Sequence, residues 1–493
     1  MFYYYNYILL IVLVSINYSI CTVHKVNCDE GIDSGDCTGS SPCETLDYAL
    51  INANNYDIIE AIGTCISPTV SNYEAYDKTS LTIRQGRHTN STPLTIMCGA
   101  IGSPINVGYA ITAIQNATLT NCTAPSATGG AIYSPIAASP LPLLFTHLHL
   151  SDNAASRGGS VGLVSSRASI EDCTFVNNAA SLSGGALHVL QSEVNLTRCA
   201  FFGNVAGTEG GGIAVYGSRG LSIFSSVFHN NSAWSGGGLH ATDLDVTLAS
   251  PLPSSSSSSP RLLSSVTFSS NTARQLGGGV AIRHASSTFS FLNVTIVRNR
   301  AVGTAACPQS DSTCAGAGGG LAVFYAAVDF EGGEVLENDA VTDTEFSPRG
   351  GGLFGFFDNH DLSGGSGNIG VFNGTVFSRN RAMGRDVAAG GGAWINGGVT
   401  FLGCEFSGNA VTSETLNSLE YNSGGAMYVQ RSAQDSADAR GDVIVSRGNF
   451  TGNVVESGGY GGAVFAKGST ELTLEGTTFK GNLCVSSQRI KAA

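Results

Sequence analysis

Apolar and polar residues alternate over short stretches of the chain, and turns rich in Asn and Gly separate these stretches. One unit recurs, in which Phe-x-x-Asn-x-Ala is followed after a gap by Gly-Gly-(Gly/Ala)-apolar, as at Phe175, Asn178 and Gly184. A period of two predicts strands, and Asn and Gly tolerate the positive φ of tight turns. Each unit is therefore predicted to form three short strands of one coil.

Eleven copies of the unit place like residues in like slots, which predicts an all-β parallel β-helix of about 12 or more coils. Adjacent coils stack ~4.8 Å apart, so Phe175, Phe201 and Phe228 should form one internal column. Insertions at 254–259, 307–314 and 432–440 widen some of the repeats. A structural ladder of Asn is expected at one corner, made of Asn153, Asn178, Asn204, Asn231, Asn271, Asn299, Asn338, Asn380, Asn409, Asn453 and Asn482.

The chain is divided into a signal peptide at 1–21, a Cys-rich N-terminal cap with the first coils at 22–110, and the β-helix at 111–493. Residues 8–14 form an apolar run, and Ser19 and Cys21 supply the small residues of a cleavage site. An uncleaved anchor is the alternative, because residues 2–23 carry no charge. Either reading predicts a secreted or cell-surface protein. The end at Ala493 has no apolar tail, so no C-terminal membrane anchor is expected.

Cysteine usage fits an oxidising compartment, although the sequence leaves the connectivity of the early cysteines open. Cys307 and Cys314 are expected to close their own loop, and Cys404 to be a buried thiol. Cys173 and Cys199 share an inward slot, as stacked thiols or as a disulfide. Six early cysteines are predicted to form disulfides: Cys28, Cys37, Cys43, Cys65, Cys98 and Cys122. Eight sequons permit glycosylation, at Asn90, Asn116, Asn121, Asn195, Asn230, Asn293, Asn373 and Asn449.

Composition excludes several classes of function. A net charge of −13 argues against a nucleic-acid partner, which would need a basic patch. No Lys lies between Lys78 and Lys467, which excludes a lysine nucleophile from the middle of the chain. No cysteine pair has CxxC spacing and no His cluster accompanies the cysteines, so no metal or other cofactor is expected.

The pairing of Gly-Gly-Ala-Ile/Leu with Phe-x-x-Asn over residues 145–482 resembles the repeat of the bacterial polymorphic outer membrane proteins. Those proteins are surface adhesins with a right-handed β-helix of the pectin-lyase-like superfamily, so the resemblance implies a right-handed coil and an adhesive role. Residues 42–50 and 57–64 resemble the start of pectin-lyase-like domains, where a short helix caps the open end of the coil. Such a cap protects an exposed sheet edge.

A ladder of charged residues is one candidate binding site. Opposite charges alternate in register on neighbouring strands, which is typical of cross-strand ion pairs, and an anionic-sugar site is the alternative. The ladder consists of Arg298, Glu337 and Arg379 in one slot, and Arg300, Asp339 and Arg381 in another. The acidic run at 329–345 is expected to be a solvated face, and Arg440-Gly441-Asp442 a chance match to a receptor-binding tripeptide.

An aromatic stripe is a second candidate, at the outward position after the glycines in four consecutive coils. Exposed rings would offer a platform for sugars or a protein partner, and burial under loops is the alternative. The stripe consists of Phe354, Trp394, Tyr428 and Phe465. His188 and His240 occupy the same slot in earlier coils and are expected to be exposed and without function.

These observations favour a secreted or surface module that recognises glycans or extracellular proteins along its flank, with its oligomeric state left open. The alternative is a polysaccharide lyase or glycoside hydrolase of the same superfamily. The Asn-Thr-Asp, Asp-Asp and His-Gly motifs of the family's hydrolases are missing; Asn271-Thr272, for example, is followed by Ala273. No catalytic residue is therefore assigned, and enzymatic activity is not expected.

Overall fold

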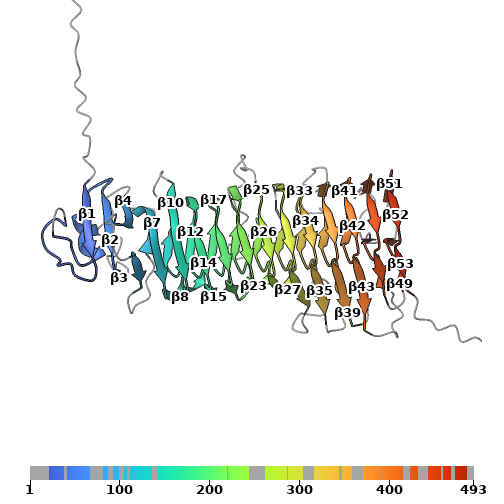
Figure 1. Cartoon of the computed structure of the whole chain (residues 1–493), viewed down its shortest axis with the longest axis horizontal. Coiled ribbons are helices and arrows are strands. Elements are labelled where there is room, and N and C mark those ends of the chain that lie inside the picture. The colour runs from blue at the N-terminus through green and yellow to red at the C-terminus, as the bar shows by residue number, and fades with distance from the viewer. Residues whose placement is uncertain are drawn as a thin grey trace, which may run out of the picture.

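The protein is an elongated right-handed parallel β-helix, seen from the side in Figure 1. The structure, a computed structural model, describes residues 22–37, 41–66, 81–86, 93–98, 105–107, 111–135, 142–218, 220–243, 261–285, 287–303, 316–342, 347–357, 370–385, 387–414, 422–430, 442–456, 459–467 and 472–485. The three predicted insertions and the predicted signal peptide lie outside these ranges.

Three long parallel sheets form the faces of the coil, and a two-stranded sheet adds β44 (Asn422–Ser423) and β49 (Gly459–Tyr460). Sheet A consists of β1 (Val23–Asn27), β2 (Ile58–Ile62), β3 (Thr64–Ile66), β4 (Leu81–Gln85), β5 (Thr95–Met97), β7 (Ile111–Thr120), β10 (Leu143–Ser151), β13 (Arg167–Glu171), β14 (Thr174–Val176), β17 (Glu193–Thr197), β18 (Ala200–Phe202), β21 (Gly220–Phe224), β22 (Val227–His229), β25 (Arg261–Ser264), β26 (Thr267–Ser269), β29 (Phe289–Leu292), β30 (Thr295–Val297), β33 (Val328–Glu331), β34 (Glu334–Leu336), β37 (Gly370–Asn373), β38 (Val376–Ser378), β41 (Val399–Leu402), β42 (Glu405–Ser407), β46 (Val443–Ser446), β47 (Asn449–Thr451), β51 (Leu472–Glu475) and β52 (Thr478–Lys480). Sheet B consists of β6 (Ile105–Asn106), β9 (Ile132–Ser134), β12 (Val161–Val164), β16 (Leu187–Leu190), β20 (Ile213–Tyr216), β24 (Leu239–Thr242), β28 (Val280–Arg283), β32 (Leu321–Phe324), β36 (Leu353–Phe356), β40 (Ala393–Asn396), β45 (Met427–Gln430) and β50 (Val464–Lys467). Sheet C consists of β8 (Thr123–Thr128), β11 (Ala154–Arg157), β15 (Ala179–Ala180), β19 (Val205–Ala206), β23 (Ser232–Ser235), β27 (Thr272–Leu276), β31 (Arg300–Gly303), β35 (Asp339–Thr342), β39 (Arg381–Gly384), β43 (Ala410–Ser413), β48 (Val454–Val455) and β53 (Leu483–Cys484).

A typical coil runs through β13, β14, β15 and β16, so it holds four strand segments where the sequence predicts three. The extra segment arises because the face in sheet A bends in the middle, at Asp172, whose φ is +53°. Asn177 (φ +53°) and Gln191 (φ +51°) turn the chain at two of the corners. Each coil has three faces, one in each long sheet, although it holds one strand segment more than the predicted three. The bend is a local left-handed residue that strand periodicity does not reveal.

The interior is filled by columns of like side chains, as the repeat predicts. The ring centroids of Phe175 and Phe201 are 4.5 Å apart, those of Phe201 and Phe228 4.6 Å, and those of Phe228 and Phe268 4.7 Å. All four rings are buried and stacked. Their spacing equals that of neighbouring strands, so in-register pairing of the backbone creates the column.

The Asn ladder forms at the corner between sheets A and C. Asn204 Nδ2 donates to the carbonyl of Phe175 in the preceding coil at 3.1 Å and to Asn231 Oδ1 in the next coil at 2.9 Å. Its Oδ1 accepts from the backbone N–H and the Nδ2 of Asn178, at 3.0 and 2.9 Å. One buried amide therefore satisfies four hydrogen bonds at a turn where the backbone has no strand partner.

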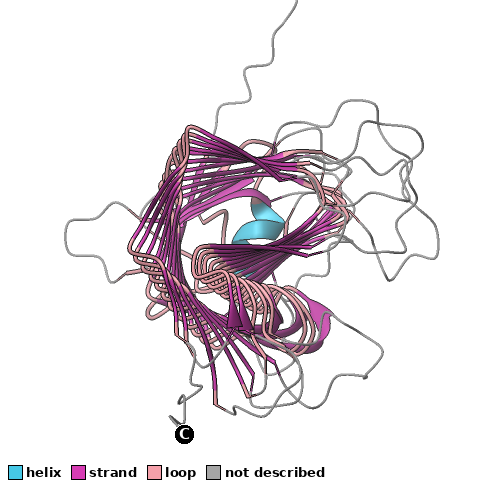
Figure 2. Cartoon of the chain, turned by 90° about the vertical axis from the view of Figure 1, so that its right-hand side faces the viewer, coloured by secondary structure: helices cyan, strands magenta, loops and turns pink. Residues whose placement is uncertain are grey.

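A helix covers the N-terminal end of the coil, as the resemblance implies. Helix α1 (Leu46–Asn52) begins at the N-cap residue Thr45, whose side chain accepts from the Tyr48 backbone N–H at 3.2 Å. Its buried residues Leu46, Ala49 and Leu50 face the core. Viewed along the axis, the helix lies within the outline of the coils (Figure 2). Strand β2 pairs with β4, and β4 pairs with β7, so the strands before and after residue 110 belong to the same sheet A.

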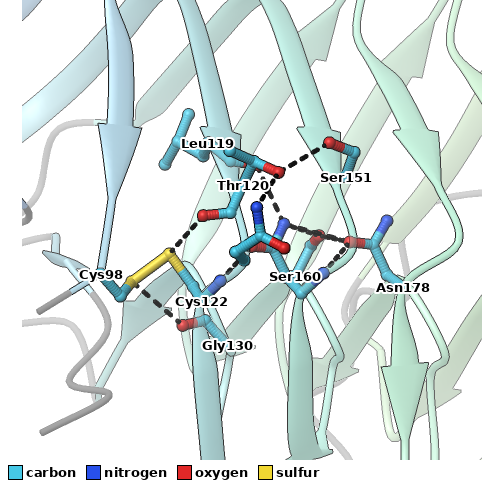
Figure 3. The surroundings of a disulfide bond; sticks show 10 residues. Cys98, Leu119, Thr120, Cys122, Gly130, Ser151, Ser160 and Asn178 are labelled. Carbon is cyan, nitrogen blue, oxygen red and sulfur yellow. Dashed lines mark hydrogen bonds between the residues drawn. A yellow bond between two sulfur atoms is a disulfide. The ribbon is translucent and has the colours of Figure 1, made fainter. Parts of the chain in front are cut away.

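The six early cysteines form three disulfides, Cys28–Cys65, Cys37–Cys43 and Cys98–Cys122. Figure 3 shows the last of these beside the start of the Asn ladder. Cys122 occupies the position that Asn fills in later coils, and its backbone N–H donates to Asn153 Oδ1 at 2.9 Å. The disulfide thus stands where the first rung of the ladder would begin.

The remaining described cysteines are free. Cys173 and Cys199 are buried as stacked thiols, which is the first of the two predicted alternatives, and Cys404 is a buried thiol as predicted. Cys307 and Cys314 lie outside the described ranges. Within those ranges, no helix has the length and apolar character needed to cross a membrane.

Candidate functional site: a polar pocket on sheet B

The glycine turn between sheets C and B brings two positions of each coil together. Gly184 has a φ of +69°, and a Cβ on Gly185 would lie 2.0 Å from a backbone oxygen of the next coil, so both positions require glycine. We call the position directly before the first glycine the pre-glycine slot. We call the position four residues after that glycine the outer slot. The turn brings the residues in these two slots into contact. In this coil, Ser183 Oγ lies 3.1 Å from His188 Nδ1.

A polar pocket of about 240 Å³ lies where these slots carry Ser, Glu and His. Tyr216 stands two residues beyond the outer slot of its coil, and its hydroxyl donates to the carboxylate of Glu209. The ring of His188 lies 5.3 Å from the Tyr216 ring, and the His240 ring lies 6.3 Å from it on the other side. The pocket is lined by Thr128, Arg157, Val164, Leu182, Ser183, His188, Leu190, Thr208, Glu209 and Tyr216.

Burial controls the protonation of the groups around this pocket. Burial raises the pKa of Tyr216 far above its usual range, and the negative charge of Glu209 adds to the effect, so the phenol stays protonated and donates. Burial lowers the pKa of His240 to about 4, which Glu209 opposes and Arg283 reinforces. His240 is therefore neutral near pH 7. Its Nδ1 lies 3.2 Å from Ser235 Oγ.

His240 also carries an unmatched polar atom. Its Nε2 is buried and has no hydrogen-bond partner among the described residues, and Glu209 Oε1 is 3.6 Å away. His188 and His240 are only 4% and 1% exposed, so the expectation that both are exposed is wrong. Alternation correctly points them away from the core, but the pre-glycine residues of the adjoining turn cover them.

The pocket combines the groups that bind a small polar ligand. Arg157 offers a fixed cation, Glu209 a hydrogen-bond acceptor, and Ser183 a hydroxyl that can donate or accept. The rings of Tyr216 and His188 supply flat apolar surfaces. Sequence reasoning missed Arg157, Ser183, Glu209 and Tyr216, because the residue in each of their slots changes from one coil to the next. The signal that marks the first three is their position directly before the glycine pair.

The predicted aromatic stripe occupies the same outer slot farther along the chain, and the structure buries most of it. Phe354, Trp394 and Tyr428 are 2%, 3% and 7% exposed, and Phe465 is half-buried. Phe354 stacks on Trp394 with centroids 4.6 Å apart, and Tyr428 follows at 6.2 Å. The guanidinium carbon of Arg349, in the pre-glycine slot, lies 5.1 Å from the centre of the Trp394 ring.

We call this group the aromatic cluster; its buried members are Leu276, Ala317, Ala322, Phe324, Phe354, Ala389, Trp394 and Tyr428. The rings pack against one another and against pre-glycine residues, so three of the four are buried. The loops that the alternative invokes lie outside the described ranges. An exposed platform of stacked rings, as the sequence suggested, is therefore not present at Phe354, Trp394 and Tyr428.

The charged ladder forms the cross-strand ion pairs that the alternating signs indicate. Glu337 contacts Arg298 Nε at 2.7 Å and Arg379 at 2.6 Å, and Asp339 receives two hydrogen bonds from Arg381 at 2.9 and 3.1 Å. The hydrogen bond from Arg298 lowers the pKa of Glu337. Arg300 pairs in register with Asp339. The arginine side chains are exposed, and the ladder lies at the corner beside the Asn residues rather than at the pocket.

The structure describes two other predicted surface features in part. Asp329, Glu331 and Glu334 of the acidic run are exposed, while Asp343 and Glu345 lie outside the described ranges. No three His, Cys, Asp or Glu residues of the described part gather as a metal site. Of Arg440-Gly441-Asp442, only Asp442 is described, and it is exposed.

One comparison with known protein families agrees with this architecture. A family model described as a right-handed beta helix region matches residues 145–317. No curated protein matches the chain. Among solved structures, the chain is similar to a rhamnogalacturonan lyase, at 11% sequence identity and a TM-score of 0.27, over 93% of this chain and 87% of that one. The protein is a right-handed β-helix protein whose outer face on sheet B holds a polar pocket.

Proposed function

We propose that this protein is a secreted or cell-surface binding module that recognises a glycan at the polar pocket. The observation that carries the proposal is the lining of the pocket, where Arg157, Glu209 and Ser183 surround the rings of His188 and Tyr216. Sugars present hydroxyls around a ring with apolar faces, so charged and hydroxyl partners beside aromatic surfaces suit them.

The size of the pocket sharpens the ligand class. A volume of about 240 Å³ is slightly below the usual range for small-molecule sites, roughly 300–1,000 Å³. The pocket therefore suits one ring or the end of a glycan, while the rest of the ligand would lie along the solenoid. An extracellular protein that inserts a polar side chain into the pocket is the other kind of partner that these lining residues could bind.

Export of the protein is part of the proposal. Three disulfides tie the N-terminal region, and disulfides persist in oxidising compartments. The apolar run at 8–14 has the length of a signal-peptide core. The resemblance of the repeat to polymorphic outer membrane proteins supports an adhesive role of the same kind.

A polysaccharide lyase or glycoside hydrolase is the competing function. Glycoside hydrolysis needs two opposed carboxyl groups, and Glu209 is the only carboxylate that lines the described pocket. A lyase would need a cation beside the uronate and a base, for which Arg157 and His188 have the right chemistry. Depolymerisation of a polyuronate is therefore an outcome that the test must include.

The test measures binding of the purified chain to a panel of neutral and acidic glycans. Glu209→Gln keeps the size of the side chain and removes its charge, and Arg157→Ala removes the cation. Loss of a charged hydrogen bond costs about 1.5–3 kcal/mol, so each change should weaken binding by about tenfold or more. Arg298→Ala, on the charged ladder, is the matched control and should bind normally.

Equal binding by the native chain and both pocket variants would refute the pocket as the site. Equal loss in Arg298→Ala would move the site to the charged ladder. Release of unsaturated products from a polyuronate, abolished by Arg157→Ala, would establish the lyase instead.

A further inference from the structure

The potential glycosylation acceptors that the structure describes lie on one side of the solenoid. Asn116 lies in β7, Asn195 in β17, Asn373 in β37 and Asn449 in β47. Asn121, Asn230 and Asn293 lie in the turns directly after β7, β22 and β29. All seven side chains are exposed, and all seven belong to sheet A or to the turns at its strand ends. The eighth acceptor, Asn90, lies outside the described ranges.

Strand geometry explains how a sequon fits on this side without disturbing the core. In Asn195-Leu196-Thr197, the middle residue is buried, so the acceptor and the Thr both point outward. Asn449-Phe450-Thr451 repeats the arrangement, with Phe450 in the internal Phe column and a 3.1 Å hydrogen bond from Thr451 Oγ1 to Asn449 Oδ1. In these two sequons the outward pair therefore lies clear of the packed interior, whereas Thr375 of the Asn373 sequon is buried.

The buried asparagines show the opposite pattern. None of the eleven Asn residues of the ladder is followed two positions later by Ser or Thr, so none is an acceptor. Sheet A supplies 27 of the 53 strands, and an even spread would place about half of the acceptors on the other two faces. Within the described ranges, sheets B and C carry none.

We propose that N-linked oligosaccharides cover the sheet A side of the solenoid and leave the sheet B side, with its polar pocket, bare. From Asn195 onward the acceptors are one or two coils apart, which is about 5–10 Å along the axis. Glycans at this spacing form a continuous hydrated layer over one face. The proposal rests on the export of the protein, which belongs to the proposed function.

The experiment expresses the full chain in a eukaryotic secretory cell and maps modified residues by peptide mass spectrometry after enzymatic glycan release, which converts each modified Asn to Asp. Modification should be found at the seven sheet A positions. Thr197→Val is the matched control, because it should abolish modification at Asn195 while leaving that residue in place. Ala179→Asn creates the acceptor Asn-Ala-Ser on an exposed position of sheet C, and this site should also be modified.

A second version of the chain, with an established secretion signal ahead of it, separates the two proposals. If only this version is exported and carries glycans on sheet A, export by the chain's own leader is refuted and the glycosylated side stands. An exported chain that lacks glycans at the sheet A positions would overturn the inference. An unmodified Ala179→Asn site would overturn the idea that acceptor placement alone leaves sheet C bare.

Discussion

The polar pocket and the aromatic cluster use the same two slots in different coils, yet the side chains in those slots act differently. In the pocket, the slots hold Ser183, Glu209 and His188, and a small volume remains between them. In the aromatic cluster, they hold Leu276, Ala389 and Trp394, and side chains fill the space. The backbone is the same in both regions, since the strands of sheet B stay in register throughout.

The difference shows how a solenoid separates architecture from chemistry. The glycine turn fixes where the two slots meet, so any pair of side chains placed there is brought into contact. Large apolar residues then extend the core outward, while small and polar residues leave a binding site. We therefore expect changes in the aromatic cluster to act on stability and changes in the pocket to act on binding.

Trp394→Ala should cause the largest loss of stability. Truncating a buried Trp leaves a cavity, and such changes cost about 3–5 kcal/mol. The stack with Phe354 is lost as well. Denaturant unfolding of the native and variant chains measures the difference, and glycan binding at the pocket of the folded variant should be unchanged. A loss of binding at native-like stability would show that the two regions do not divide their roles in this way.

Repetition determines how much of this could be predicted from the sequence. The Phe column and the Asn ladder are predictable because each slot recurs in register, and Phe201 or Asn204 is one of many equivalent residues. The burial of Trp394 and His240 is not predictable from alternation. A period of two tells which residues face away from the coil, whereas exposure depends on what the neighbouring turn places over them.

One hydrogen bond of the pocket joins two residues that do not recur in their slots. Glu209 and Tyr216 meet only once, because the preceding and following coils carry Ser183 and Ser235 in the slot of Glu209. A single sequence offers no signal that separates such a pair from ordinary surface variation. Its recognition requires the geometry of the glycine turn.

Acid should destabilise the pocket region and spare the aromatic cluster. His240 has a pKa of about 4 in the fold and about 6.5 in an unfolded chain, so between these values the unfolded chain binds more protons. Stability should therefore fall as the pH is lowered from 6.5 to 4, by up to about 3 kcal/mol. Denaturant unfolding at a series of pH values measures the slope.

His240→Ala provides the control for this pH dependence, because the coils on either side carry Ala214 and Ala281 in the same slot. The variant removes the titrating group and should flatten the slope between pH 6.5 and 4. The same slope in the variant would show that groups other than His240 cause the pH dependence.

The double variant Glu209→Leu/Tyr216→Phe should convert the pocket to the character of the aromatic cluster. It copies Leu276 and Phe324, which occupy the equivalent slots of later coils. Both partners of one hydrogen bond are replaced by apolar groups, so stability should stay within about 1 kcal/mol of the native value. Binding should be lost. Calorimetric titration with the best ligand of the glycan panel measures the affinity, and denaturant unfolding measures the stability. An unchanged affinity in the double variant would contradict the prediction.

Glu337→Ala should have the smallest effect, because the charged ladder lies outside both regions. Its partners Arg298 and Arg379 are exposed, and solvent and salt screen such pairs. Arg298 holds the pKa of Glu337 below its usual range. The carboxylate therefore adds its small contribution to folding stability above its unfolded pKa, and this contribution is lost as the pH falls through the lowered pKa. Thermal unfolding at low and high salt should barely separate the variant from the native chain. A clear destabilisation that vanishes at high salt would instead show that the ladder holds neighbouring coils together by electrostatic attraction. The charged ladder would then be a third region with its own role, beside the pocket and the aromatic cluster.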